Sequence, residues 1–206
     1  MARASCPRCL RPQATCICGF ITPTATACEL LILQHPLEAQ HAKNSARLLH
    51  LSLPGSRLVV GEVFDDAALQ ALMPDDKTTV LLYPPTDYEG HAAPAQVDVA
   101  ALRDLQKLRL IVLDATWRKS RKMLHQSPAL QRLPRLALDD VPQGRYAIRK
   151  AHAPGQLSTL EATCAALAQL EGDAVRWQPL LAAFDGFVAQ QRVFMPNEPL
   201  VPVNTA

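Results

Sequence analysis

The sequence predicts an α/β fold, in which a mostly parallel sheet carries helices on both faces. Apolar runs of strand length alternate along the chain with stretches of helical period. This alternation is typical of parallel sheets, because two parallel strands must be joined by a crossover that is usually a helix. Of the 206 residues, 49% are hydrophobic, which is enough for a chain of this length to bury a core. A small cysteine-rich segment at residues 1–22 precedes the predicted α/β domain at 23–206.

The predicted strands are short apolar runs that end at polar or turn-forming residues. The four longest are expected at residues 28–34, 56–60, 78–83 and 108–113. Two shorter strands are expected at residues 135–138 and 145–148. Helices are expected at residues 38–49, 65–72, 97–107, 118–125, 158–170 and 180–194. Ser158 and Glu161 have the spacing of a capping box, which predicts a helix start there, with Thr159 as the alternative cap.

Polar residues follow three of the predicted strands. The three tips read Gln34-His35, Tyr83-Pro84-Pro85-Thr86 and Asp114-Ala115-Thr116-Trp117. The carboxyl ends of parallel strands meet at one edge of a sheet, and α/β proteins bind their ligands beyond that edge. We therefore expect the three tips to line one crevice.

The fourth strand delivers two candidate functional side chains. Asp114 is either a functional carboxylate at the crevice or a cap that accepts hydrogen bonds from the first N–H groups of the next helix. Trp117 either stacks on a base or an adenine ring or packs in the core, the commoner fate of a Trp beside a strand end. The residues alone leave both alternatives open.

Positive charge is concentrated in the middle of the chain. Residues 103–150 contain 12 Lys/Arg and four Asp/Glu, a net charge of +8, whereas the whole chain carries +2. This asymmetry indicates a local surface for a polyanion; the alternative is an ordinary solvated face. The cations nearest the fourth strand tip and the last predicted strand are Arg118, Lys119, Arg121, Lys122, Arg145, Arg149 and Lys150.

Three further side chains near the first strand offer contacts to an anion. His35 is either a proton carrier or phosphate contact, or a hydrogen-bonded histidine at a turn. Lys43 and Arg47 have helical spacing, so they form either a second anion patch or an ordinary wet helix face.

The cysteine pattern indicates a metal site. It reads Cys6-Pro7-Arg8-Cys9 followed by Cys16-Ile17-Cys18. Two close pairs of thiolates can close a tetrahedral zinc site, and such a site would be structural because all four positions are filled by protein. The alternative is a set of reduced free thiols. Cys28 and Cys164 lie in apolar strand and helix patterns and are expected to be buried.

The sequence also lacks the signals of several function classes. It has no run of 18 or more apolar residues and no apolar core of a secretion signal, so we expect a cytoplasmic protein without a membrane span. The phosphate-binding motifs GxGxxG and GxxxxGK[ST] and the GxSxG nucleophile elbow are absent. The candidate catalytic groups are therefore carboxylates, histidines and tyrosines.

Taken together, the motifs resemble those of the DTW domain family. They are Cys6-x-x-Cys9 with Cys16-x-Cys18, Gln34-His-Pro-x-Glu38, Tyr83-Pro-Pro, Asp114-x-Thr-Trp117 and Leu157-Ser-Thr-Leu-Glu161, in this order over nearly the whole chain. The resemblance implies a fold related to the SPOUT methyltransferases, with a knotted cofactor site. It also implies transfer of the 3-amino-3-carboxypropyl group of S-adenosylmethionine to N3 of a tRNA uridine, in the variable loop for bacterial members, with release of 5′-methylthioadenosine.

Within such a reaction we expect the following roles for individual residues. The cofactor pocket would be formed by Tyr83, Pro84, Pro85, Leu113, Thr116, Trp117, Leu157, Ser158, Thr159 and Glu161. The tRNA phosphates would be held by His35, Lys43, Arg47, Arg118, Lys119, Arg121, Lys122, Arg145, Arg149 and Lys150. Asp114 is the first candidate for the base that removes the N3 proton, ahead of Glu161 and Glu38.

Two rival functions fit the same residues. One is an RNA methyltransferase that uses the same cofactor, and the other is a non-enzymatic, zinc-containing RNA-binding module. The sequence does not fix which uridine is the acceptor, or whether the protein acts as a monomer or a homodimer.

Overall fold

The sheet of this protein is parallel throughout. We obtained a computed structural model of the chain that describes residues 4–74, 76–85, 94–139, 144 and 157–194. Within these residues the sheet has five strands in the order β2-β1-β4-β3-β5, and every neighbouring pair is parallel. The strands are β1 (Glu29–Gln34), β2 (Arg57–Val60), β3 (Thr78–Leu82), β4 (Leu108–Asp114) and β5 (Arg135–Leu136). The predicted α/β class is confirmed.

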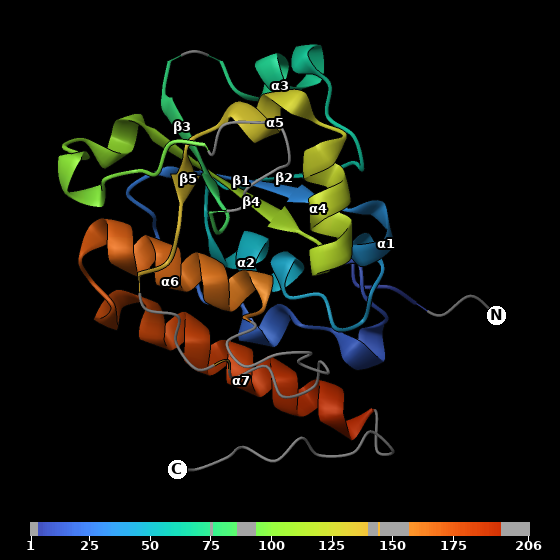
Figure 1. The fold of residues 1–206 in the computed structure, drawn as a ribbon. Helices are drawn as coiled ribbons and strands as arrows, with labels where there is room; N and C mark the ends of the chain where they lie inside the picture. The colour runs from blue at the N-terminus through green and yellow to red at the C-terminus, as the bar shows by residue number, and fades with distance from the viewer. Residues whose placement is uncertain (1–3, 75, 86–93, 140–143, 145–156, 195–206) are drawn as a thin grey trace, which may run out of the picture.

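The central strand β4 is buried along its whole length. It lies between β1 and β3, and helices cover both faces of the sheet (Figure 1). A strand enclosed in this way appears in sequence as a continuous apolar run, which explains why it could be predicted. Its register aligns Asp114 with Gln34 of β1, so two of the predicted polar tips lie side by side.

One face of the sheet packs against three short helices. These are α3 (Asp66–Leu72), α4 (Trp117–His125) and α5 (Pro128–Arg132). Their contact with the sheet is an apolar cluster that includes Leu31, Ile111 and Met123. The neighbouring strand residues point to the opposite face, because side chains alternate along a strand.

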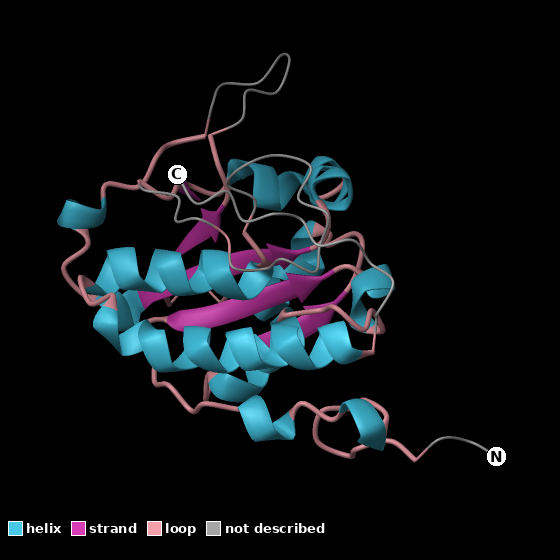
Figure 2. Ribbon diagram, turned by 90° about the horizontal axis from the view of Figure 1, so that it is seen from below, coloured by secondary structure: helices cyan, strands magenta, loops and turns pink. Residues whose placement is uncertain are grey.

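The other face carries α2 (Ala46–Ser52), α6 (Thr159–Glu171) and α7 (Gln178–Val193), which Figure 2 shows in front of the strands. The larger apolar cluster lies here and includes Leu30, Leu110 and Phe184. Cys28 and Cys164 belong to it, so the prediction that both are buried is confirmed. No helix in the described part of the chain has the length and apolar character that a membrane crossing requires.

The prediction of one helix over residues 38–49 is wrong. The chain forms α1 (Pro36–Ala39), then a turn segment at residues 40–45, and then α2. Pro36 favours a helix start, because its fixed φ suits the first turn and it has no N–H to leave unpaired. The chain is not helical just before α2 because the Asn44 side chain turns toward the buried Asp114 carboxylate, at the end of β4, and donates a hydrogen bond to it.

The predicted helix at 97–107 is also wrong. Two 3-10 helices stand in its place, η3 (Val99–Ala101) and η4 (Leu105–Lys107). Asp98 and Asp104 each accept a hydrogen bond from the backbone N–H two residues later. Such local bonds compete with a regular helix and favour a turn.

The remaining expectations are met in large part. The strand predicted at 135–138 is shorter, and the one at 145–148 lies outside the described residues. Helix α6 starts at the predicted capping box and ends at Gly172, whose φ of 66° is the left-handed conformation that favours glycine. The last helix begins two residues earlier than predicted.

The cysteine-rich segment packs against α7. It contains two 3-10 helices, η1 (Gln13–Thr15) and η2 (Cys18–Phe20). Ile17 is fully buried, and the Phe20 ring lies so close to Gly186 that a Cβ there would be 3.0 Å from it. The segment therefore shares the core of the α/β body.

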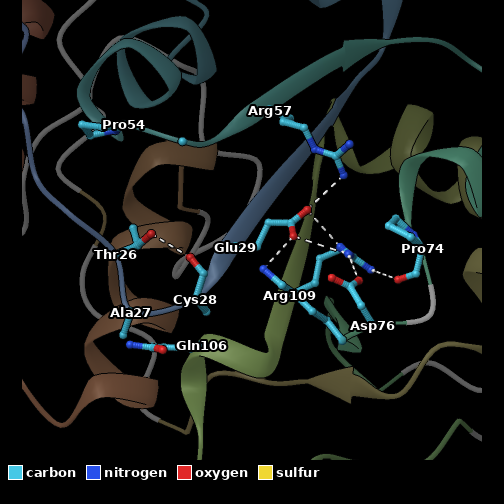
Figure 3. Close-up of a pocket in the computed structure, with 12 residues that line it drawn as sticks. Thr26, Ala27, Cys28, Glu29, Pro54, Arg57, Pro74, Asp76, Gln106 and Arg109 are labelled. Carbon is cyan, nitrogen blue, oxygen red and sulfur yellow. Dashed lines mark hydrogen bonds and ion pairs between the residues drawn. The ribbon is translucent and has the colours of Figure 1, made fainter.

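Charged side chains form a cluster at the amino ends of the strands, where a pocket of about 530 Å³ opens (Figure 3). The Glu29 carboxylate lies within 3.0 Å of Arg109 Nε and Lys77 Nζ, and 2.9 Å from Arg57 Nη2. Arg109 is buried and also contacts Asp76 at 3.0 Å. Because each of these cations has a carboxylate partner within the protein, we assign this cluster a structural role at the end opposite the polar tips.

The cations control the ionisation of Glu29. Partial burial alone would raise the pKa of this carboxyl, but hydrogen bonds and charges from Arg109 and Lys77 outweigh it and lower the pKa to about 2. A carboxyl with a depressed pKa stabilises the folded state above its ordinary pKa of 4.5. That contribution is lost as the pH falls from 4.5 through 2.

We predict that Glu29→Gln lowers the free energy of unfolding at pH 7 by about 3 kcal/mol, because it leaves the buried Arg109 charge without its main partner. Chemical denaturation measures the loss. The difference between wild type and variant should shrink as the pH falls from 4.5 toward 2, where the wild-type carboxyl also becomes neutral.

The matched control is Arg132→Gln, which breaks an exposed ion pair with Asp66. Such pairs contribute less than about 1 kcal/mol. Equal losses of stability in the two variants would contradict the structural role of the Glu29 cluster.

Candidate active site and metal centre

Asp114 is the centre of the candidate site. It ends β4 and is 3% exposed. Its Oδ2 accepts hydrogen bonds from Gln34 Nε2 at 2.8 Å and Asn44 Nδ2 at 2.6 Å, and its Oδ1 accepts one from Thr159 Oγ1 at 2.6 Å. The cap alternative for Asp114 is wrong, because the N-cap of α4 is Thr116 and no side chain caps that helix. A carboxylate offers about four acceptor positions, so the three donors from the described part of the chain leave one position, on Oδ1.

The turn segment 40–45 orients Asn44 toward this carboxylate. The Asn44 Oδ1 accepts hydrogen bonds from Arg47 N at 3.1 Å and Gln34 Nε2 at 3.3 Å. The two N–H donors fix which side of the amide is oxygen, so Nδ2 must face Asp114. The segment thus connects the start of α2 with the tips of β1 and β4.

The start of α6 supplies the third donor and is itself held in place. Ser158 Oγ accepts from Glu161 N at 3.2 Å, and Glu161 Oε2 accepts from Ser158 N at 2.8 Å. This capping box confirms the helix start that the sequence predicts. Leu160 N donates to Ser45 Oγ at 3.3 Å, so the turn segment is also hydrogen-bonded to the start of α6. Leu157 lies half-buried just before the cap.

Trp117 and Tyr83 pack against each other just beyond the ends of β4 and β3. Trp117 is 49% exposed, so it is not a core residue. Its ring meets the edge of the buried Tyr83 ring at a centroid distance of 5.7 Å and an interplanar angle of 68°. Tyr83 OH lies 3.3 Å from Ser120 Oγ, and the Arg135 guanidinium lies over the Tyr83 ring at 5.8 Å. A half-exposed aromatic ring on a rigid base is suited to stack on a planar ligand.

Four other residues predicted for the cofactor pocket are neighbours of Tyr83, Asp114 or Trp117 in the chain. Pro84 and Pro85 are exposed directly after Tyr83, and Thr116 is exposed at the start of α4. Leu113 is buried on β4 beside Asp114. Thr86 lies outside the described residues.

The four cations of α4 differ in their surroundings. Lys119 Nζ lies 2.8 Å from the buried Glu38 carboxylate, and Lys122 Nζ lies 2.6 Å from Glu62. Arg118 and Arg121 are exposed and form no ion pair with any residue in the described ranges. Two of the four charges are therefore neutralised within the protein, and two face solvent.

The anion contacts predicted near β1 are mostly buried. His35 is 4% exposed; its Nδ1 accepts a hydrogen bond from Leu37 N at 3.1 Å and caps α1. This is the turn alternative for His35. Lys43 is also buried, whereas Arg47 is half-buried. Arg145, Arg149 and Lys150 lie outside the described residues.

The four thiols of the cysteine-rich segment converge on one point. All four sulfur atoms lie within 4.8 Å of one another, with Cys6 Sγ 3.6 Å from Cys18 Sγ and Cys9 Sγ 3.8 Å from Cys16 Sγ. Zinc–sulfur bonds of about 2.3 Å in a tetrahedron place the sulfurs about 3.8 Å apart, so the cluster fits this metal.

The chemistry of the thiols agrees with a cation at this point. Hydrogen bonds from the backbone N–H groups of Cys9 and Arg8 lower the pKa of Cys6 to about 6. Burial and the neighbouring thiolates raise the pKa of Cys18 to about 12. Several thiolates can share so small a volume only when a metal ion offsets their mutual repulsion.

Comparison with known proteins identifies the family. Residues 3–192 match the family described as the DTW domain. The chain belongs to the DTW domain family. No solved structure matches the chain significantly.

Named relatives of this DTW domain come from animals and plants. It is 35% identical over 178 residues to tRNA-uridine aminocarboxypropyltransferase 2 of Drosophila melanogaster. That alignment covers 82% of this chain and 67% of the relative. It is 31% identical over 177 residues to the protein of the same name in Mus musculus, covering 82% of this chain and 57% of the relative. It is 29% identical over 201 residues to tRNA-uridine aminocarboxypropyltransferase A of Arabidopsis thaliana, covering 83% and 74%. The DTW domain thus spans from 57% to 74% of the length of these relatives.

Two hydrogen-bond partners of Asp114, Gln34 and Asn44, could not be predicted from the sequence. The sequence predicts Gln34 at the crevice as a strand tip, but not as a donor to Asp114. It predicts Asn44 within a helix, and no local pattern marks this residue. Ser120, the partner of Tyr83, also gives no signal, because a serine within a basic helix resembles any other polar surface residue.

We predict that the purified protein holds one zinc ion per chain and that Cys9→Ser loses it, because three thiolates and a hydroxyl bind zinc far more weakly than four thiolates. Elemental analysis together with thermal denaturation measures this. The Cys9→Ser variant should also have a lower Tm, since the bound metal supplies folding energy to a small segment.

Cys28→Ala is the control for this experiment, because Cys28 is buried apart from the cluster. It should retain a full complement of zinc. Zinc content that is unchanged in Cys9→Ser would overturn the assignment of the metal centre.

Proposed function

We propose that this DTW domain is a cytoplasmic tRNA-uridine aminocarboxypropyltransferase that uses S-adenosylmethionine as donor and holds a structural zinc ion. The observation that carries the proposal is the buried Asp114 carboxylate at the carboxyl edge of a parallel sheet, next to a basic helix. Its relatives in three organisms carry the name of this activity. We also propose the SPOUT-like, knotted arrangement of the cofactor site as the finer description of the fold.

The acceptor must lose a proton before it can react. The imide N3 of uridine is a poor nucleophile while protonated, and a positioned carboxylate typically accelerates such proton removal by ~10²–10⁴-fold. We assign this step to Asp114, whose Oδ1 keeps one acceptor position beside Thr159. Glu161 and Glu38 are less suitable, because the capping box engages the first and Lys119 engages the second.

Transfer then depends on placement of the donor. The N3 lone pair forms a bond to the methylene carbon attached to the sulfonium, and the electrons of the broken C–S bond remain on sulfur, which leaves in 5′-methylthioadenosine. The sulfonium is already an activated leaving group, so no catalytic metal is required. Geometry selects which carbon reacts. The donor would be held in that geometry by the start of α6 and by four residues after β3 and β4, namely Tyr83, Pro84, Pro85 and Trp117.

The basic surface would hold the tRNA. Arg118 and Arg121 face solvent, so their charges are available to phosphates. Lys119 and Lys122 already have carboxylate partners and would contribute less. Arg47 is half-buried and would make a weaker contact to the tRNA backbone.

We predict that tRNA incubated with the protein and S-adenosylmethionine gains the mass of an aminocarboxypropyl group on uridine, as measured by nucleoside mass spectrometry. Asp114→Asn should lower kcat by ~10²-fold or more, because it removes the proposed base. Calorimetry should show that S-adenosylmethionine still binds.

Asp104→Asn is the control, since it neutralises an exposed carboxylate outside the site. A methylated product would favour the methyltransferase rival, and the absence of any donor binding would favour the RNA-binding module. Undiminished activity in Asp114→Asn would show that Asp114 only supports the structure.

We predict that Arg118→Ala and Arg121→Ala each weaken tRNA binding and reduce the slope of log K against log salt by about 1. Filter binding at several salt concentrations measures both. Arg132→Gln is the control, because its guanidinium already pairs with Asp66 and should change the slope little. The same slope in all four proteins would exclude the α4 arginines from the tRNA surface.

A further inference from the structure

We propose that Arg11, in the cysteine-rich segment, is a positioning residue that holds Asn44 against the Asp114 carboxylate. The inference rests on the proposed function, in which Asp114 is the base. It gives the metal-binding segment a second role, which is to fix the geometry of a site that it does not itself enter.

Arg11 reaches from the metal centre to the turn segment 40–45. Its Nη1 donates to Ala42 O at 2.6 Å and its Nη2 donates to Asn44 O at 2.9 Å. A guanidinium holds two acceptors in a fixed fork, so the pair of bonds sets both the position and the direction of this backbone segment. Its guanidinium also lies over the Phe187 ring of α7 at 5.0 Å, which anchors it from a third direction.

Asn44 is in turn held at every polar group. Its N–H donates to His41 O at 2.9 Å, and its carbonyl accepts from Arg11. Its side-chain oxygen accepts from Arg47 N, and its side-chain nitrogen donates to Asp114 Oδ2 at 2.6 Å. Arg11 therefore binds the backbone of the same residue whose side chain donates to the candidate base.

The metal centre determines the direction of Arg11. Cys6 N donates to Arg11 O at 2.8 Å, and Leu10 N donates to Cys6 O at 2.9 Å. Leu10, between Cys9 and Arg11, has a φ of 61°, a left-handed conformation that a leucine adopts only where its surroundings enforce it. Four thiolates around one ion would enforce this turn and so aim Arg11 at the segment 40–45.

The alternative role for Arg11 is a contact to tRNA phosphate, and the contacts argue against it. Its two Nη atoms already donate to backbone carbonyls at short distances. A phosphate contact would survive replacement by lysine, because lysine keeps the charge. A bidentate grip on two carbonyls would not.

The test compares Arg11→Gln and Arg11→Lys with Arg8→Gln, which removes an exposed cation from the same turn. We expect both Arg11 variants to retain zinc and to lower kcat at saturating tRNA and donor by about 10- to 100-fold, the effect of a small misplacement in a reactive site. Arg8→Gln should match the wild type. In an Asn44→Ala background, Arg11→Gln should lower kcat by less than about a further twofold, because the two residues act in series.

A second readout does not depend on activity. One side-chain amide proton of Asn44 is donated to a buried carboxylate, so NMR should find it slow to exchange in the wild type and at least about tenfold faster in Arg11→Gln. If wild-type protein fails to modify tRNA but this difference is present, the proposed function fails and the Arg11–Asn44 coupling stands.

Three results would overturn the inference. They are a loss confined to KM for tRNA that lysine restores, kcat effects that multiply in the Arg11→Gln, Asn44→Ala double variant, and Asn44 amide exchange that Arg11→Gln leaves unchanged. The first would make Arg11 a phosphate contact, and the other two would show that it does not act through Asn44.

Discussion

The hydrogen bonds to the Asp114 carboxylate are the constraint on which the rest of the site depends. A carboxylate that is 3% exposed must find donors within the protein, because water does not reach it freely. Those donors come from three segments far apart in sequence: the tip of β1, the turn before α2, and the start of α6. Each segment had to be shaped to present one donor, and this requirement explains why the chain breaks a helix at residues 40–45 and caps α6 with a complete capping box.

The two ends of the parallel sheet use charge in opposite ways. At the amino ends, Glu29 and Asp76 pair with the three cations that line the pocket. At the carboxyl ends, Asp114 is surrounded by neutral donors, while Arg118 and Arg121 face solvent close by in sequence. Under the proposed function, an anionic partner would bind at the end where these two arginines face solvent. This division follows the general tendency of parallel α/β proteins to bind ligands beyond the carboxyl ends of their strands.

Features with a local signal could be predicted from the sequence, and features with a distant cause could not. The buried run of β4, the capping box of Ser158 and Glu161, and the four clustered cysteines are each evident within a few residues. The break at Asn44 could not be predicted, because its cause is Asp114, 70 positions later in the chain. The exposure of Trp117 could not be predicted either, because a Trp beside a strand end usually packs in the core, whereas the structure leaves it 49% exposed.

The docking of the cysteine-rich segment on α7 has a consequence for how the protein is made. The Cys16 carbonyl and Gln190 Nε2 are joined by a hydrogen bond across 174 positions, and Arg11 lies on Phe187. The thiols are synthesised well before α7, so they could capture metal before the surface on which their segment rests exists. Contacts of such long range form slowly, because a long loop must close first. During translation the chain would therefore pass through a stage in which it could hold metal and yet be inactive, and the site would become functional only after α7 has been synthesised.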